Sequence, residues 1–398
     1  MYENLASLAA FAFIFSVIAG RIERSTITGP IIFIAFGLIA GPFGLGFLNI
    51  EVKAVELRVV ADLTLALVLF IDAANADLST LRSHARIPFR MLLIGLPLSI
   101  ALGACVGMVV FPDISLFELW ILATMLAATD AALGKGVVTN KAVPARIREG
   151  LNVESGLNDG LCVPVLLVFL ALATGAGGES GSSGLALKLV AEEIGIGLGV
   201  AVVMTLVGVK LISICAQRDW FTDVWKQIPV VTLALACFAT AQTLHGSGYI
   251  AAFVGGLLFG HLAKEHTHKL VMAGEGIAEL LAMLTWVLFG GIVGKYLAGI
   301  TLDVVIYSLL SLTLIRMLPN IIALTGLGEK LETKLFLAWF GPRGLASIVF
   351  CIIVANADLP GESVLIHTVV CTVMLCVLAH GLTANAWAKG IARRLKSE

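Results

Sequence analysis

The sequence predicts an all-α polytopic membrane protein with about thirteen transmembrane helices. Its 398 residues are 59% hydrophobic and only 13% charged, with a mean hydropathy of +1.00. A soluble domain carries far more charge than this. The apolar residues also cluster in long runs, and most charges lie between the runs. A net charge of −1 gives no sign of nucleic-acid binding.

Each predicted span is a run close to the roughly 20 apolar residues that a helix needs to cross a bilayer. Thirteen such runs lie at about 4–20, 27–48, 59–76, 88–111, 116–138, 149–174, 187–214, 228–244, 248–262, 276–298, 301–324, 333–356 and 362–386. The first run lacks a basic start and a clean cleavage site, so we expect it to remain as a span. No loop is long enough for a soluble domain, so residues 1–398 are interpreted as a single integral membrane unit.

The loop charges predict the orientation. With the N-terminus outside, the inside segments hold 18 of the 26 basic residues: Arg21, Arg24, Arg82, Arg86, Arg90, Lys141, Arg146, Arg148, Arg218, Lys226, Lys264, Lys269, Lys330, Lys334, Lys389, Arg393, Arg394 and Lys396. The outside loops hold Lys53, Arg58 and Lys188, with Lys295 near the rim. Because positive loops stay in the cytoplasm, we expect a plasma (inner) membrane protein with its N-terminus outside and its C-terminus cytoplasmic.

Three minor features complete the outline. Gly175 to Gly184 is rich in glycine and serine, which predicts a flexible outside linker between two halves of the chain. The seven cysteines form no Cys-x-x-Cys pair and lie mostly in apolar runs, so we expect buried small hydrophobes rather than disulfides or metal ligands. His261, His266 and His268 gather in one inside loop, where they are solvated or form a pH sensor or weak metal site.

The most informative stretch is Gly150-Leu-Asn-Val-Glu-Ser-Gly-Leu-Asn-Asp-Gly160, which opens an apolar membrane run. Residues four apart share one face of a helix, which pairs Glu154 with Asn158 and Ser155 with Asp159. Ionisable groups inside a span are costly and indicate an ion or proton pathway with a partner charge elsewhere. Gly156 and Gly160 predict a seam of small residues along which another helix can approach closely.

Three other spans carry polar residues in their middles. The fifth contains Thr129 and Asp130, the eleventh contains Arg316, and the twelfth contains Gly-Pro342-Arg343-Gly. Proline removes a backbone hydrogen bond, and non-helical backbone at this depth must line a cavity or lie buried in protein. Interrupted spans at corresponding places in two halves are typical of transporters built from inverted repeats.

A structural interpretation competes with this one. The three acids and two arginines could form a polar network that only holds helices together. For Glu154 and Arg316 that interpretation is favoured, because structure is the commonest role of a charge-compensated pair.

Together these residues resemble the bacterial NhaP-type sodium/proton antiporters of the first monovalent cation:proton antiporter family. The similarity rests on Thr129-Asp130, the Glu154-Ser-Gly-Leu-Asn158-Asp159 motif, Arg316 and Gly-Pro-Arg343-Gly, and it covers nearly the whole chain. It implies the NhaA-like antiporter fold, with inverted repeats and two crossing discontinuous helices. It also implies ion-translocation helices at 88–174 and 301–386, dimerisation or scaffold helices at 1–76 and 187–298, and a homodimer in membrane lipid.

The resemblance assigns roles by matching position. Asp159 would bind the cation or the proton, Asp130 and Thr129 would lie at the crossing, and Ser155 would line the site. Asp72 would match a further acidic residue of the site. Glu154 and Asn158 would engage Arg316, while Pro342 and Arg343 would form the crossing-helix break.

Two positions depart from the family pattern. Ala131 follows Asp130 where the family usually has proline, so the break in the fifth span would depend on Gly134 and Gly136 or be milder. Lys135 lies where many members are apolar, and it would either extend to the inner surface or modulate the charge of the site.

The expected function is electroneutral exchange of one monovalent cation, Na⁺ first, for one proton, which serves pH homeostasis. Burial disfavours the charged form of a carboxylate, so Asp159 could exchange a proton for a cation held by Asp159, Asp130, Ser155, Thr129 and the carbonyls freed by the break. No cofactor, catalytic residue or enzymatic activity is expected. The alternatives are a K⁺/proton antiporter, a proton-coupled organic-anion symporter and, less favoured, an ion channel or a membrane hydrolase. The sequence does not distinguish Na⁺, Li⁺ and K⁺.

Overall fold

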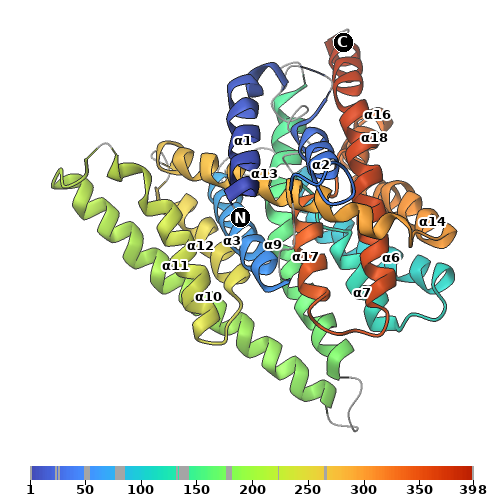
Figure 1. The fold of residues 1–398 in the computed structure, drawn as a ribbon. Coiled ribbons are helices and arrows are strands. Elements are labelled where there is room, and N and C mark those ends of the chain that lie inside the picture. The colour runs from blue at the N-terminus through green and yellow to red at the C-terminus, as the bar shows by residue number, and fades with distance from the viewer. Residues whose placement is uncertain are drawn as a thin grey trace.

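The computed structural model describes residues 2–22, 25, 27–48, 54–76, 86–130, 133, 143–175, 182–222, 224–263 and 267–396. Over these ranges the regular structure is entirely helical, with no β-strand (Figure 1). Seven helices in this part of the chain are long and apolar enough to cross a membrane, and five shorter apolar helices of 10–17 residues accompany them. The chain is therefore an all-helical, multi-pass membrane protein. The predicted count of thirteen spans goes beyond the seven that length and composition establish.

The helices follow one another along the chain with short connections. Those of the first half are α1 (Tyr2–Ile22), α2 (Gly29–Ala40), α3 (Ala54–Asn75), α5 (Arg86–Arg90), η1 (Met91–Gly95), α6 (Leu96–Val110), α7 (Leu116–Met125) and α9 (Ala145–Gly175). Those of the second half are α10 (Ser182–Gln217), η2 (Trp225–Gln227), α11 (Pro229–Thr243), α12 (Gly248–Ala263), α13 (Thr267–Leu297), α14 (Leu302–Leu310), η4 (Ser311–Ile315), α15 (Arg316–Ala323), α16 (Leu331–Trp339), α17 (Leu345–Val354) and α18 (Glu362–Lys396).

Helices from both halves are interleaved in space. Figure 1 shows α10, α11 and α12 on one side of the molecule and α6, α7, α14 and α18 on the other. On the first side α12 packs against α3, α10 and α11, and α13 packs against α2 and α3. On the second side α7 packs against α6 and α9, and α18 packs against α14 and α17. The contacts between the two sides run chiefly through α9 and α3.

Several predicted boundaries differ from the structure. The second span, predicted over 27–48, is helical only to Ala40, because Gly41 precedes Pro42 and a residue before proline avoids the helical conformation. The predicted linker is shorter than expected, since Gly175 ends α9 and Ser182 begins α10, and residues 176–181 lie outside the described part. Arg58 and Lys188 lie on helices rather than in loops. α18 continues through the predicted tail to Lys396.

Two π-helical turns interrupt the fourth and eleventh predicted spans. η1 (Met91–Gly95) precedes Pro97, and η4 (Ser311–Ile315) precedes Pro319. Proline has no N–H for the carbonyl four residues earlier, and that carbonyl belongs to the π turn in both places. A π turn lets such a carbonyl reach the next N–H along the chain, so each turn follows from its proline.

The predicted glycine seam on α9 is confirmed. The Cβ position of Gly156 faces the Asp72 backbone and Cβ of α3 at 3.4–3.5 Å. A side chain at Gly160 would collide with the Phe253 ring of α12. The polar stretch of α9 therefore lies against helices of the opposite side of the molecule.

Candidate ion-binding site

The two interrupted spans meet beside the polar motif of α9. In the fifth span α7 begins with a capping box, in which Ser115 and Glu118 each accept the other's backbone N–H, and it ends at Met125. Residues 126–130 are not helical. In the twelfth span α16 ends at Trp339 and α17 begins at Leu345. Both breaks are thus present in the structure, and residues 131–132 and 134–142, which follow the first, lie outside the described part.

Asp130 joins the two breaks directly. Its backbone N–H donates to the Pro342 carbonyl at 2.7 Å, and its Oδ2 accepts the Leu345 N–H at 2.9 Å. Leu345 is the first residue of α17, so the carboxylate lies at a helix N-terminus, where the helix dipole stabilises negative charge. A Cβ at Gly344 would collide with the Asp130 carboxylate, which explains the second glycine of the Gly-Pro-Arg-Gly motif.

Asp159 lies across from this junction on α9. It is 7% exposed, and its Oδ1 accepts the Thr129 N–H from the first break at 3.1 Å. The carboxylates of Asp72 and Asp130 are close enough to interact with it electrostatically. Two acidic residues of the prediction, on α3 and at the break, therefore surround the third.

Glu154 and Arg316 form the predicted contact. Arg316 Nη1 donates to Glu154 Oε1 at 2.9 Å, and both side chains are at most 2% exposed. Asn158 lies between this pair and the first break. Its Nδ2 is 3.2 Å from Glu154 Oε1, 3.0 Å from Thr129 Oγ1 and 3.1 Å from the Ala127 carbonyl oxygen, and it donates to these acceptors.

Arg343 ties three backbone segments together instead of facing an open site. Its Nε donates to the Leu126 carbonyl at 2.8 Å, its Nη1 to the Gly341 carbonyl at 2.7 Å and its Nη2 to the Ser311 carbonyl at 3.0 Å. The side chain is 1% exposed. At Gly341, the first glycine of the motif, a Cβ would collide with the Arg316 guanidinium.

The carbonyls freed by the first break already have donors. Three consecutive oxygens accept side-chain hydrogen bonds: Met125 from Ser347 Oγ at 2.7 Å, Leu126 from Arg343 Nε at 2.8 Å, and Ala127 from Asn158 Nδ2 at 3.1 Å. The expectation that freed carbonyls ligate the cation is therefore wrong for these three. A broken helix end in an apolar medium needs such donors, because an unpaired carbonyl there is costly.

The remaining predicted site residues occupy nearby positions. Ser155 is buried on α9, one turn before Asp159. Asp72 lies on α3 against Gly156 and is within electrostatic range of Asp130 as well. Within the described residues, no three histidine, cysteine or acidic side chains come together closely enough to hold a metal ion. A cation at this place would depend on hydroxyl and backbone oxygens as well as carboxylates.

Other sequence expectations have mixed outcomes. Five cysteines are buried, but Cys105 is exposed and Cys215 is partly exposed, and all seven are free thiols. His261 is exposed in the last turn of α12. Ala131, Gly134, Lys135, Gly136, His266 and the side chain of His268 lie outside the described residues.

Three residues of the site escaped the sequence analysis. Ser347 caps Met125, while Cys376 and His380 of α18 contact the second break. The available signal was a thiol and an imidazole four residues apart inside an apolar run, which places both on one helix face.

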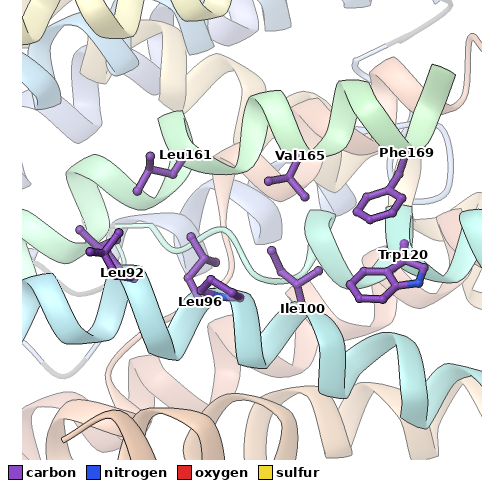
Figure 2. Close-up of a pocket in the computed structure, with 9 residues that line it drawn as sticks. Leu92, Leu96, Ile100, Trp120, Leu161, Val165 and Phe169 are labelled. Carbon is purple, nitrogen blue, oxygen red and sulfur yellow. The ribbon is translucent and has the colours of Figure 1, made fainter. Parts of the chain in front are cut away.

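A separate cavity lies between α6, α7 and α9. Figure 2 shows its lining side chains, which are all apolar, and its volume is about 410 Å³. The lining residues are Leu92, Leu93, Leu96, Pro97, Ile100, Trp120, Leu161, Val165 and Phe169. A cavity without polar groups cannot replace the hydration shell of an ion, so it is not part of an ion path.

Comparison with known proteins defines the class. The structure resembles that of the sodium proton antiporter MjNhaP1 from Methanocaldococcus jannaschii, with a TM-score of 0.76, 20% identity and 99% of each chain covered. The chain thus has the antiporter fold of a membrane transporter. Residues 8–390 match the family model described as sodium/hydrogen exchanger, transmembrane. The protein therefore belongs to the sodium/hydrogen exchanger family.

Curated relatives are similar at low identity. A K⁺/H⁺ antiporter, NhaP2, from Shewanella oneidensis is 20% identical over 90% of this chain and 62% of its own length. A Na⁺/H⁺ antiporter, ApNhaP, from Aphanothece halophytica is 24% identical over 95% of this chain and 73% of its own length. The chain spans less than two thirds of the length of the Shewanella relatives.

Proposed function

We propose that the protein exchanges a monovalent cation, most simply Na⁺, for a proton at Asp159. The observation that carries this proposal is a buried carboxylate on α9 that faces the junction of two broken helices, with two further carboxylates nearby. Burial disfavours the charged form, and a bound cation or proton removes that penalty. The two substrates then compete for one group.

The proposed cation site consists of Asp159, Asp130, Thr129 and Ser155, with Asp72 at its margin. Asp159 supplies the exchangeable charge. Asp130 supplies a second carboxylate whose Oδ2 is held by the Leu345 N–H. Hydroxyl and backbone oxygens complete a set of hard ligands suited to Na⁺.

The neighbouring Glu154, Asn158 and Arg316 are proposed to be structural. Arg316 compensates the charge of Glu154, and Asn158 links that pair to the first break. Such a pair stays charged through the cycle, because neutralising one partner would strand the other in an apolar environment.

The exchange is proposed to be electroneutral, one cation for one proton. Asn158, the residue before Asp159, cannot titrate, and Glu154 is neutralised by Arg316. Asp130 was the weakest point of this argument in the sequence. Its position at the N-terminus of α17 supports a carboxylate that remains ionised.

The proposed architecture extends beyond the described helices. We propose thirteen spans arranged as inverted repeats, with core helices at 88–174 and 301–386 and scaffold helices at 1–76 and 187–298. The π turns of the fourth and eleventh spans and the breaks of the fifth and twelfth support this pairing of halves. The contacts of α2, α3 and α10–α13 with one another support a separate scaffold. A homodimer in the plasma (inner) membrane, with the N-terminus outside, completes the proposal.

The main alternative differs only in the cation. Relatives are named both K⁺/H⁺ and Na⁺/H⁺ antiporters, so K⁺ remains the second candidate. An organic-anion symporter is disfavoured, because Arg343 uses its guanidinium on three backbone carbonyls.

A cation panel tests the proposal. Everted membrane vesicles carrying the protein are acidified inside, and proton efflux is followed by fluorescence dequenching after addition of Na⁺, Li⁺ or K⁺. We expect efflux with at least one of the three and none from vesicles with Asp159→Asn. Efflux that responds to none of them would contradict the antiporter proposal.

A further inference from the structure

We propose that Cys376 and His380 of α18 act as a positioning pair that replaces the backbone hydrogen bond lost at the break in the twelfth span. The two residues are one helical turn apart and at most 1% exposed. The proposal deepens the proposed function, on which its consequence for transport rests. Its structural part does not depend on transport.

The geometry identifies the missing bond. In an uninterrupted helix the N–H of Arg343 would donate to the carbonyl of Trp339, four residues earlier. Here the Arg343 N–H donates to Cys376 Sγ at 2.9 Å, and His380 Nε2 lies 2.9 Å from the Trp339 carbonyl oxygen. Cys376 Sγ and His380 Nδ1 are 3.2 Å apart. The two side chains therefore bridge the two backbone groups that the break separates.

The donors and acceptors of this bridge can be assigned. A carbonyl only accepts, so His380 Nε2 carries a hydrogen and donates to Trp339. In neutral imidazole Nδ1 then has no hydrogen for the Cys376 carbonyl, which is 3.1 Å away, and it accepts from the Cys376 thiol. The bridge thus runs from the Arg343 N–H through the thiol and the imidazole to the Trp339 carbonyl, which also accepts from Gly341 N–H at 2.8 Å.

Aromatic contacts hold the pair in place. The His380 ring stacks on the Trp339 indole with a centroid distance of 4.9 Å and meets the Phe340 ring edge-on at 6.2 Å. Trp339 Nε1 donates to Thr383 Oγ1, one turn further along α18, at 3.1 Å. α18 therefore contacts the end of α16 through its side chains and fixes where that helix stops.

The bridge matters because of what lies between its ends. Pro342, which accepts the Asp130 N–H, lies between Trp339 and Arg343, and Leu345, which donates to the Asp130 carboxylate, follows two residues later. Without the pair, the segment can move relative to α18 and carry both Asp130 contacts with it. Cys376 and His380 would thus set the position of a proposed cation ligand that they do not touch.

Matched substitutions separate the hydrogen bonds from the packing. His380→Phe keeps a ring but removes both hydrogen bonds, whereas His380→Gln places an amide N–H near the position of Nε2. Cys376→Ala removes the thiol, whereas Cys376→Ser keeps a donor and acceptor. Cys371→Ala, at another buried thiol of α18, controls for lost volume. Purified variants are compared by thermal melting and by exchange in proteoliposomes.

We expect His380→Phe and Cys376→Ala to raise the half-saturating cation concentration about fivefold, as for the loss of one hydrogen bond. His380→Gln and Cys376→Ser should restore most of it, and Cys371→Ala should resemble the unmodified protein. The proposal is wrong if the Phe and Ala variants keep the original half-saturation, or if Gln and Ser are as impaired as they are. It is also wrong if the loss follows melting temperature alone.

Hydrogen–deuterium exchange provides a readout without transport. The Arg343 amide should exchange faster in Cys376→Ala than in Cys371→Ala, because only the former removes its acceptor. Equal exchange in the two variants would overturn the bridge, even if His380→Phe fails to fold. If the unmodified protein exchanges no cation but this difference is seen, the proposed function fails while the bridge stands.

Discussion

At the scale of single residues, Glu154 and Asp159 are both buried carboxylates of α9 with opposite surroundings. Glu154 accepts a hydrogen bond from the Arg316 guanidinium, whereas Asp159 accepts the Thr129 N–H and lies near two further carboxylates. One carboxylate is neutralised within the protein and the other needs an ion from outside it. This difference in partners underlies the roles proposed for them.

Removing either member of the Glu154 and Arg316 pair should destabilise the protein. A buried charge left without its partner costs about 3–5 kcal/mol, so Glu154→Ala and Arg316→Ala should each lower the melting temperature. The double variant should be less impaired than the sum of the two, because it leaves no stranded charge. Thermal melting of the three purified variants in one detergent measures this, and strict additivity would mean that the side chains do not interact.

Gly344 should tolerate no side chain. A Cβ there would collide with the Asp130 carboxylate, and such overpacking costs about 1–3 kcal/mol or displaces the group. We expect Gly344→Ala to reduce exchange in proteoliposomes by about tenfold. Gly195→Ala on α10, where nothing lies within 4 Å of the added carbon, is the control. Equal activity of the two variants would show that Asp130 is not held at this position.

At the scale of helices, the two breaks have different causes. The break in the twelfth span contains Pro342, so the sequence predicts it. The break in the fifth span ends α7 at Met125 without a proline, and donors from other helices satisfy its carbonyls. A helix end stabilised by Ser347, Arg343 and Asn158 is a tertiary fact, which no local pattern in the sequence contains.

The same distinction limits what the sequence predicts elsewhere. Polar residues in apolar runs marked Asp159, Glu154 and Arg316 correctly as neighbours, because burying charges requires partners. The predicted role of freed carbonyls failed, since the donors that take them come from distant segments. The shortened second span and the long α18 reflect a Gly-Pro step and helix continuation beyond the apolar run, which hydropathy alone does not resolve.

Arg343 should not be replaceable by lysine. Its planar fork donates to three carbonyls on three segments, and an ammonium group lacks that geometry. Each carbonyl left without a donor costs about 1–3 kcal/mol, so Arg343→Lys should melt at a lower temperature and lose exchange. Arg90→Lys, at an arginine that donates to the Thr325 carbonyl at the surface, is the control. Similar melting of both variants would contradict this role.

At the scale of the whole molecule, the proposed one-for-one exchange moves no net charge. A membrane potential alone should therefore drive no proton movement through the protein. Proteoliposomes with a K⁺ gradient and valinomycin provide the potential, with Na⁺ as substrate if K⁺ is not one, and an internal pH dye reports protons. Proton movement in the absence of cation and pH gradients, relative to liposomes carrying Asp159→Asn, would show that a second group titrates.

The central claim is that cation and proton compete for Asp159. The most direct measurement is the half-saturating cation concentration for exchange, determined in proteoliposomes over a series of pH values. Competition for one carboxylate predicts that this concentration rises toward about tenfold for each unit by which pH falls on the acid side, while saturating cation overcomes the inhibition. Asp159→Asn should show no exchange at any pH. A half-saturating concentration that does not change with pH, or exchange that persists in Asp159→Asn, would contradict the claim.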